Sequence, residues 1–439
     1  MGLGIGYGIL NNLCGPDEEI VCMAEPDPSH WDKIRAVVKH HQPAADSSKI
    51  QAFYDYREML EKRGGEIDAV AIATPNHHHA AAAILAMSKG LHVYVEKPMA
   101  LTIEEVRLMH AAQKKSGVAT QVGNHGHSDE GMRRLVEYIQ SGALGQIREV
   151  WAFDDRLNAM MVRPPKAEPP KGMDWDAWCG PAPVCDYYAA TADHNGMHPH
   201  DWHAWIGYGN GAIGNMGTHI LDPVVWALRL GEVHPSSVEA TELMWGAAGS
   251  WTWRNTIHWR FPARKGLDAV TLHWYDGVRD GVPYDKAHVN KTGVCLKRED
   301  QNLPPIIEEL EKKHGQNLGC LGTVYVGENG VMAIGPHGDG LQFVPDELRN
   351  KLPKPPKTIP REKGMDHQQD WLRAIRSPNR PAGCNFDYSA PLATTVLLGN
   401  VAARAGLKKL EWNGTAITND ESANAFLKTT YRPGWEIKG

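Results

Sequence analysis

The sequence lacks the features of membrane and nucleic-acid-binding proteins. No apolar stretch in its 439 residues approaches the length of a membrane span, and no charged-then-apolar targeting signal opens the chain. The formal net charge is -6 and there is no long Lys/Arg run, which argues against a nucleic-acid partner. A hydrophobic fraction of 42% and a charged fraction of 22% are instead typical of a soluble globular protein.

Disulfide frameworks are not indicated either. The chain has seven cysteines, an odd number, and no Cys-x-x-Cys pair. This pattern predicts reduced thiols and a cytoplasmic location.

Phenylalanine is scarce and tryptophan is abundant. Fifteen tryptophans stand against six phenylalanines, and they concentrate between Trp151 and Trp274. Stacked indoles often line carbohydrate sites, but a tryptophan-rich β core explains the same enrichment. Both interpretations stay open at this point.

A glycine-rich turn opens the chain with only Met1 before it. Its glycines are Gly2, Gly4, Gly6 and Gly8, and apolar positions of a helix follow. Such a turn lets backbone amides and a helix N-terminus hold a pyrophosphate, although the spacing fits G-x-G-x-x-x-G and not the strict G-x-G-x-x-G. Because this fingerprint should follow a strand, we expect that the chain as given begins late; a flexible glycine-rich tail is the alternative.

An acid follows the next predicted strand. Residues 20–24 form this strand and Glu25 lies at its end, about 20 residues after the glycine turn. An acid there is the expected partner of a ribose 2′-hydroxyl and would repel a 2′-phosphate. NAD is therefore favoured over NADP, and the alternative is a plain strand-end carboxylate.

A strand, helix, strand unit brings Lys97 to the edge of a parallel sheet. Residues 68–75 and 91–95 are predicted strands, separated by a helix over residues 80–88. Glu96 and Lys97 end the second strand, where ligands of open α/β sheets bind. The alternative is a solvated Lys-Glu pair that binds no ligand. The last strand of this Rossmann-type domain covers residues 119–123, which predicts a first domain of residues 1–123.

The remaining residues, 124–439, predict a second α/β domain. Segments 147–153, 240–245, 256–261, 269–275, 322–326 and 330–334 alternate as strands of a large, open and mostly antiparallel sheet. A helix over residues 215–227 would place Asn215, His219 and Asp222 on one face. The histidines at 194, 198, 200 and 203 lack any recognised zinc spacing, so no metal is predicted.

Three motifs together resemble the Gfo/Idh/MocA family of nicotinamide-dependent oxidoreductases. They are Thr74-Pro75-Asn76-His77, Glu96-Lys97-Pro98 and Gly214-Asn215-Met216-Gly217-Thr218-His219-Ile220-Leu221-Asp222. The resemblance covers nearly the whole chain and implies a Rossmann domain followed by an open-sheet domain. It also implies cofactor contacts from Thr74, Pro75, Asn76, His79, Glu96, Lys97 and Asn124, in addition to the glycine turn and Glu25.

The resemblance further implies catalytic roles. Lys97 would orient or polarise the reacting oxygen and His219 would accept the proton. The family's acid, four residues before the histidine, is Asn215 here, and an amide cannot take a proton. His219 would therefore work alone or with another residue such as Asp222.

Three functions agree with this pattern. The first, which we favour, is an NAD-dependent dehydrogenase of a sugar, inositol or sugar-derived polyol. The second is a glycoside-cleaving enzyme in which NAD is reduced and reoxidised within one cycle. The third is a nicotinamide-binding regulator without turnover. The resemblance also implies a homo-oligomer, a dimer or tetramer.

Overall fold

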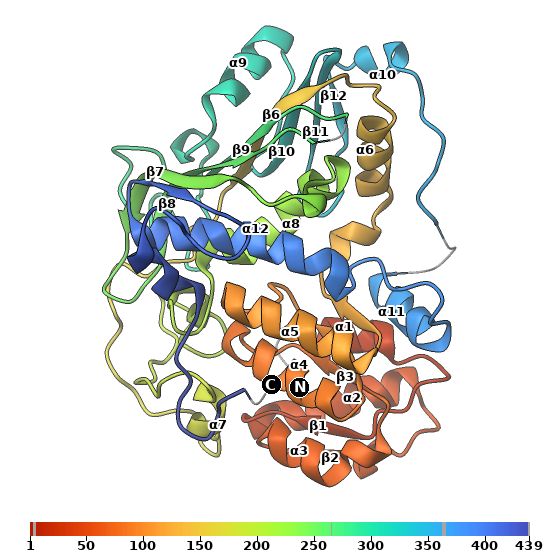
Figure 1. Ribbon diagram of the computed structural model, residues 1–439. Coiled ribbons are helices and arrows are strands. Elements are labelled where there is room, and N and C mark those ends of the chain that lie inside the picture. Colours follow the sequence, from red (N-terminus) through yellow and green to blue (C-terminus); the bar gives the residue numbers. More distant parts are fainter. Residues whose placement is uncertain (3–5, 265, 362–365, 438–439) are drawn as a thin grey trace.

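The computed structural model describes residues 1–2, 6–264, 266–361 and 366–437, and these form an α/β protein (Figure 1). The N-terminal part is built on short parallel strands between helices, and the C-terminal part on one large sheet. The helices α8 (Gly211–Ala227) and α12 (Phe386–Ala405) lie between the two parts in the figure. This arrangement confirms the predicted fold class.

The parallel strands of the N-terminal part are divided between two small sheets. The strands β1 (Cys22–Ala24) and β2 (Gln51–Phe53) form one sheet, and β3 (Ala69–Ile72), β4 (His92–Val95) and β5 (Thr120–Val122) form the other. The first two residues lie between them. The backbone N–H of Gly2 donates to the carbonyl of Ala24, and that of Ala73 donates to the carbonyl of Met1.

The helices of this part follow the predicted pattern closely. They are α1 (Gly6–Leu13), α2 (Trp31–His41), α3 (Tyr56–Arg63), α4 (Asn76–Ser88) and α5 (Ile103–Ser116). Two details differ from the sequence-based expectation. β2 was not predicted, because three residues beginning with Gln51 give no alternating pattern. α4 begins four residues earlier than expected, so it includes His77, His78 and His79, which are all buried.

The C-terminal sheet has eight strands in the order β12-β11-β10-β6-β9-β8-β7-β13. All neighbours are antiparallel except β6 and β9, which confirms the prediction of a mostly antiparallel sheet. The strands are β6 (Ile147–Asp154), β7 (Ser237–Trp245), β8 (Thr252–Phe261), β9 (Val270–Gly277), β10 (Gly322–Gly327), β11 (Gly330–Ile334), β12 (Gln342–Val344) and β13 (Lys409–Glu411).

Helices cover both faces of this sheet. α6 (Glu130–Gln140), α8 and α12 pack on one face, and α9 (Pro305–His314) covers part of the other through Ile307 and Leu310. The fully buried Trp259 and Trp274 belong to the main core, whereas Trp178 and Trp202 line a cavity. Trp259 and Trp274 therefore confirm the interpretation of a tryptophan-rich β core, and the interpretation of a carbohydrate site stays a prediction.

The end of the chain returns to the N-terminal part, as expected. α11 (His367–Arg376) packs beside α1, where Trp371 joins a buried cluster with Ile9, Leu13 and Tyr94. α12 packs against both α5 and α8. Two short helices complete the described elements: α7 (Trp175–Cys179) and α10 (Leu348–Lys351). The boundary at residue 123 stays a prediction.

Two expectations from the sequence concern membrane-spanning segments and disulfides. None of the helices in the described ranges is long and apolar enough to cross a bilayer. All seven cysteines are free thiols.

A capping box fixes the start of α5, the helix that meets α12. The Thr102 side chain accepts from the Glu105 N–H, and Glu105 accepts from the Thr102 N–H. We expect Thr102→Ala to lower the free energy of unfolding by about 1 kcal/mol, because one buried helix N–H loses its acceptor. Urea unfolding measures this loss, with Thr430→Ala at an exposed threonine as control. Equal stability of the two variants would contradict the prediction.

Candidate active site

A cavity of about 330 Å³ lies at the carboxyl ends of β1, β3 and β4. This is the edge where open parallel sheets bind ligands. Seven of the predicted site residues line it: Gly2, Glu25, Thr74, Pro75, Asn76, Glu96 and Lys97. The C-terminal part also contributes to the lining, with Trp178, His198, Pro199, His200, Trp202 and His203.

Glu25 lies where a nucleotide ribose is expected. It is 3% exposed and follows β1 directly. Its Oε1 accepts from the Asp27 N–H at 2.9 Å, and its carbonyl accepts from the Trp31 indole. A carboxylate held in this way at the cavity wall fits the hydroxyls of a ribose.

The glycines of the predicted turn lie in different environments in the structure. Gly2 lines the cavity with a φ of +74°, and a Cβ there would lie 2.5 Å from the Thr74 nitrogen. Only glycine fits such a close backbone approach. Gly6 is the first residue of α1 and lines a neighbouring cavity, Gly8 is exposed on that helix, and Gly4 lies outside the described residues.

Lys97 reaches from the end of β4 to α8 of the C-terminal part. Its Nζ donates to the Asn215 Oδ1 at 2.6 Å and to the Asn215 carbonyl at 3.2 Å. Burial lowers the pKa of Lys97 to about 8, while the charge of Glu96 acts in the opposite direction. An amine in this state changes its protonation within the range in which enzymes usually work.

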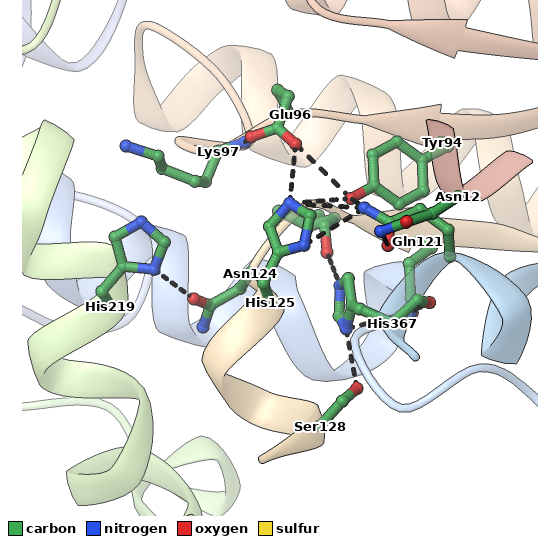
Figure 2. Close-up of polar contacts among 12 residues, drawn as sticks. Asn12, Tyr94, Glu96, Lys97, Gln121, Asn124, His125, Ser128, His219 and His367 are labelled. Atoms are coloured by element: carbon green, nitrogen blue, oxygen red, sulfur yellow. Dashed lines mark hydrogen bonds and ion pairs between the residues drawn. The ribbon is translucent and has the colours of Figure 1, made fainter. Parts of the chain in front are cut away.

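Glu96 is oriented by a hydrogen-bond network and does not contact the Lys97 amine. Its Oε2 accepts from the Lys97 backbone N–H at 3.2 Å, and its Oε1 lies 3.3 Å from His125 Nε2. Figure 2 shows Tyr94 and His125 beside this carboxylate, and Gln368 donates to the Tyr94 hydroxyl at 3.1 Å. Glu96 therefore acts on Lys97 through its charge.

His219 lies one helical turn after Asn215, on the same face of α8. Its Nδ1 is 2.7 Å from the Asn124 Oδ1, and the Asn124 Nδ2 donates to the Thr218 carbonyl at 3.4 Å. With the amide in that orientation, Nδ1–H is the donor and Nε2 keeps its lone pair. Burial lowers the pKa of His219 well below its usual value, and the charge of Lys97 adds to this effect. Figure 2 shows Lys97 and Asn124 on different sides of the imidazole.

Asp222 lies apart from these groups, which corrects the expectation that it assists His219. It is fully buried, and its carboxylate contacts His127 Nδ1 at 3.0 Å and the Tyr388 hydroxyl. These two side chains satisfy its oxygens in the packed region beneath α8. The hydrogen-bond partner of His219 Nδ1 is instead Asn124.

Asn76 and His79 have different environments. Asn76 begins α4, lines the cavity, and donates to the Asn210 side chain at 2.7 Å. The ring nitrogens of His79 lie 2.8 Å from the Pro98 carbonyl and 2.9 Å from the Thr74 carbonyl. His79 therefore ties the Lys97–Pro98 turn to the end of β3, and it is not among the residues that line the cavity.

The four histidines between residues 194 and 203 do not form a common metal-binding cluster among the described residues. His200 and His203 line the cavity, and His194 lies against Tyr188. His198 Nε2 is 3.5 Å from the Asp27 carboxylate. Asp27, His30 and His198 have ligand atoms within 4.8 Å of one another, a geometry that a metal ion could use. That no metal is required stays a prediction.

Sequence reasoning missed the polar residues that follow β6 and β11. Asp154 ends β6 and Arg156 follows two residues later, while His337 follows β11 and lies 4.6 Å from His219 between ring centroids. The charge of Arg156 contributes to lowering the pKa of both Lys97 and His219. The run Asp154-Asp155-Arg156 at the end of a predicted strand was the available signal.

Two family models match the chain. One, described as an oxidoreductase family with an NAD-binding Rossmann fold, matches residues 5–124. The other, described as the C-terminal alpha/beta domain of the same oxidoreductase family, matches residues 147–262.

Curated relatives match over part of the chain. A levoglucosan dehydrogenase from Pseudarthrobacter phenanthrenivorans is 33% identical over 120 residues, which cover 26% of this chain and 30% of the relative. A scyllo-inositol 2-dehydrogenase (NAD(+)) from Bacillus subtilis is 30% identical over 149 residues, covering 33% of this chain and 40% of the relative. The matched segments thus span less than half the length of these relatives.

Solved structures share the fold over nearly the whole chain. An aldose-aldose oxidoreductase from Caulobacter crescentus, complexed with glycerol, gives a TM-score of 0.56 at 16% identity, covering 94% of this chain and 98% of that one. A levoglucosan dehydrogenase complexed with NADH and levoglucosan gives 0.54 at 17% identity, covering 93% and 94%. These structures show the shared fold. The two domain matches, which together cover more than half of the chain, show that it belongs to the Gfo/Idh/MocA family of oxidoreductases.

Proposed function

We propose that this protein is an NAD-dependent oxidoreductase that transfers a hydride between the cofactor and a sugar, inositol or sugar-derived polyol. The observation that carries the proposal is the position of Lys97 at the cavity wall, where its amine hydrogen-bonds Asn215, one helical turn before His219. The charge of Lys97 is close enough to lower the pKa of His219. The similarity to levoglucosan and inositol dehydrogenases supports a carbohydrate substrate.

The two side chains have complementary tasks. NAD, when bound, supplies the carbon that exchanges hydride with the substrate. The Lys97 ammonium polarises the substrate oxygen and stabilises negative charge that develops on it. His219 Nε2 accepts the hydroxyl proton, because Asn124 holds the other ring nitrogen as a donor. The lowered pKa keeps this imidazole neutral and able to accept.

Glu25 supports NAD as the cofactor. Its buried carboxylate at the end of β1 would hydrogen-bond ribose hydroxyls and repel a 2′-phosphate. Gly2 and Thr74 line the same cavity as Glu25. NADP is the less favoured cofactor.

Glycoside cleavage with internal redox cycling is the second candidate. A glycosyl hydrolase family 109 protein from Shewanella woodyi is 28% identical over 146 residues, which cover 32% of this chain and 30% of that protein. The two candidates differ in whether added NAD is consumed. A regulator without turnover would bind NAD and show neither activity.

Lys97→Ala provides the direct test of the proposed function. We expect turnover to fall by about 100- to 10,000-fold, because the charge that stabilises the developing alkoxide is removed. NADH formation from NAD with a panel of sugars and inositols measures turnover, and tryptophan fluorescence measures NAD binding, which should persist. Lys115→Ala, at an exposed lysine of α5, is the control.

Several outcomes would contradict this proposal. Retained activity in Lys97→Ala would remove the amine from the mechanism. Release of an aglycone without NADH would favour the second candidate. NAD binding without either activity in the natural protein would favour a regulator.

Asn215→Asp tests the protonation state of Lys97. In the natural protein we expect kcat/KM to fall as the pH rises through about 8, because the ammonium loses its proton there. A carboxylate at the Asn215 Oδ1 position, 2.6 Å from Nζ, would stabilise the ammonium and move this fall upward by about 1 pH unit. Profiles of kcat/KM from about pH 6 to about pH 11, recorded for the natural protein and the variant, measure the change. If kcat/KM of the variant falls at the same pH as in the natural protein, a group other than Lys97 causes the fall.

We also propose that the protein is a homo-oligomer, assembled through the sheet face opposite α8. Trp151 stacks on His273 on this face, and Met244 and Trp245 at the end of β7 are exposed. Apolar side chains in such a position are typical of an interface. Light scattering should give a mass that is a multiple of 48.5 kDa, and Trp151→Glu should reduce it. A natural protein of 48.5 kDa in solution would contradict the proposal.

A further inference from the structure

The substrate end of the site contains a guanidinium without an acidic partner. Arg156 follows β6 and is partly exposed. Its Nη1 contacts the Met216 sulfur, a weak acceptor. Within the described residues, no carboxylate lies close enough to Arg156 to form an ion pair. Most of its donors are thus available to a ligand.

Arg156 lies among the groups assigned to the reaction. Its positive charge contributes to lowering the pKa of Lys97, His219, His203 and His337. Such an effect requires proximity to all four side chains. Arg156 also contacts Met216, which follows Asn215 on α8, and Asn215 accepts from Lys97 Nζ. Arg156 therefore borders the region that the substrate of the proposed reaction must occupy.

The charge of Arg156 acts on two neighbouring acids, Asp154 and Asp155, and opposes the rise that burial causes in the pKa of each. Neither of these two carboxyl groups forms an ion pair with Arg156. Asp154 is 2% exposed, and neither of its carboxyl oxygens has a hydrogen-bond partner among the described residues. Burial raises the pKa of Asp154 well above its usual value, which favours the uncharged acid. On β6 it alternates with Val150 and Ala152, which belong to the main core, so its side chain points to the same side of the sheet. A protonated Asp154 can hydrogen-bond a substrate hydroxyl.

We propose that Arg156 binds an anionic group of the substrate, so that the enzyme acts on a sugar acid in preference to a neutral polyol. The inference rests on the proposed function and specifies its substrate class. A guanidinium presents paired donors that match the two oxygens of a carboxylate, as in a uronate or aldonate. A phosphate ester offers the same chemistry. A neutral polyol would leave this charge in the site without a counter-ion.

A matched set of sugars tests the inference. Glucose, glucuronate, gluconate and glucose 6-phosphate are compared by NADH formation and by binding to the NAD-loaded protein, measured by calorimetry. We expect an anionic sugar to bind and react best. A preference for glucuronate or gluconate identifies a carboxylate, and a preference for glucose 6-phosphate identifies a phosphate ester.

Arg156→Gln should selectively weaken the binding of the anionic sugar. We expect KM and the calorimetric Kd for the anion to rise by about 10- to 100-fold, with a smaller change in kcat, because a charge-assisted contact is lost. The Kd for glucose should change much less, because glucose offers no charge to the guanidinium. Arg156→Lys retains the charge without the paired donors and should give an intermediate loss. Arg148→Gln, an exposed arginine of the same strand, controls for net charge.

Two results would overturn the inference. One is tighter binding and faster reaction of glucose than of every anion, with Arg156→Gln affecting all sugars equally; the proposed function would then survive. The other is that no anion binds the NAD-loaded protein. If no sugar reacts but an anion binds and Arg156→Gln abolishes that binding, the site assignment holds while the proposed reaction fails.

Discussion

The hydrogen bond from Lys97 to Asn215 is the contact on which the site depends. It joins the end of β4 to α8, two elements 118 residues apart in the chain. The Lys97–Pro98 turn is fixed by His79, and α8 is fixed by its packing against β6, β10 and α12. Because both ends are anchored in packed structure, the amine is held in one position beside His219.

This contact also explains the electrostatics of the site. Asn215 accepts a hydrogen bond from the lysine but brings no negative charge, so burial dominates and the pKa of Lys97 falls. The same low-polarity surroundings lower the pKa of His219, whose proton position is set by Asn124. An amide thus orients each of the two groups. Among the described residues no carboxylate forms an ion pair with Arg156, and this gives the guanidinium its importance for substrate choice.

The sequence predicted the main features of the fold because its patterns are local. Alternating apolar residues identified β6 through β11. β2 was missed because three residues carry no period, and the start of α4 was placed late because buried histidines look polar in sequence. The residues Lys97, Asn215 and His219 were found because strand ends and helix spacing are also local signals.

The sequence by itself determined the fold class and which residues carry reactive groups, since both follow from the order and spacing of residue types. Only the tertiary structure decided which of these groups meet. Asp222 shares a helix face with His219 in the sequence, yet its carboxylate is engaged by His127 and Tyr388. Asn124 and Arg156 reach the site from separate segments. The partner of a buried polar group is fixed by long-range packing, which brings distant segments together and which no local pattern encodes.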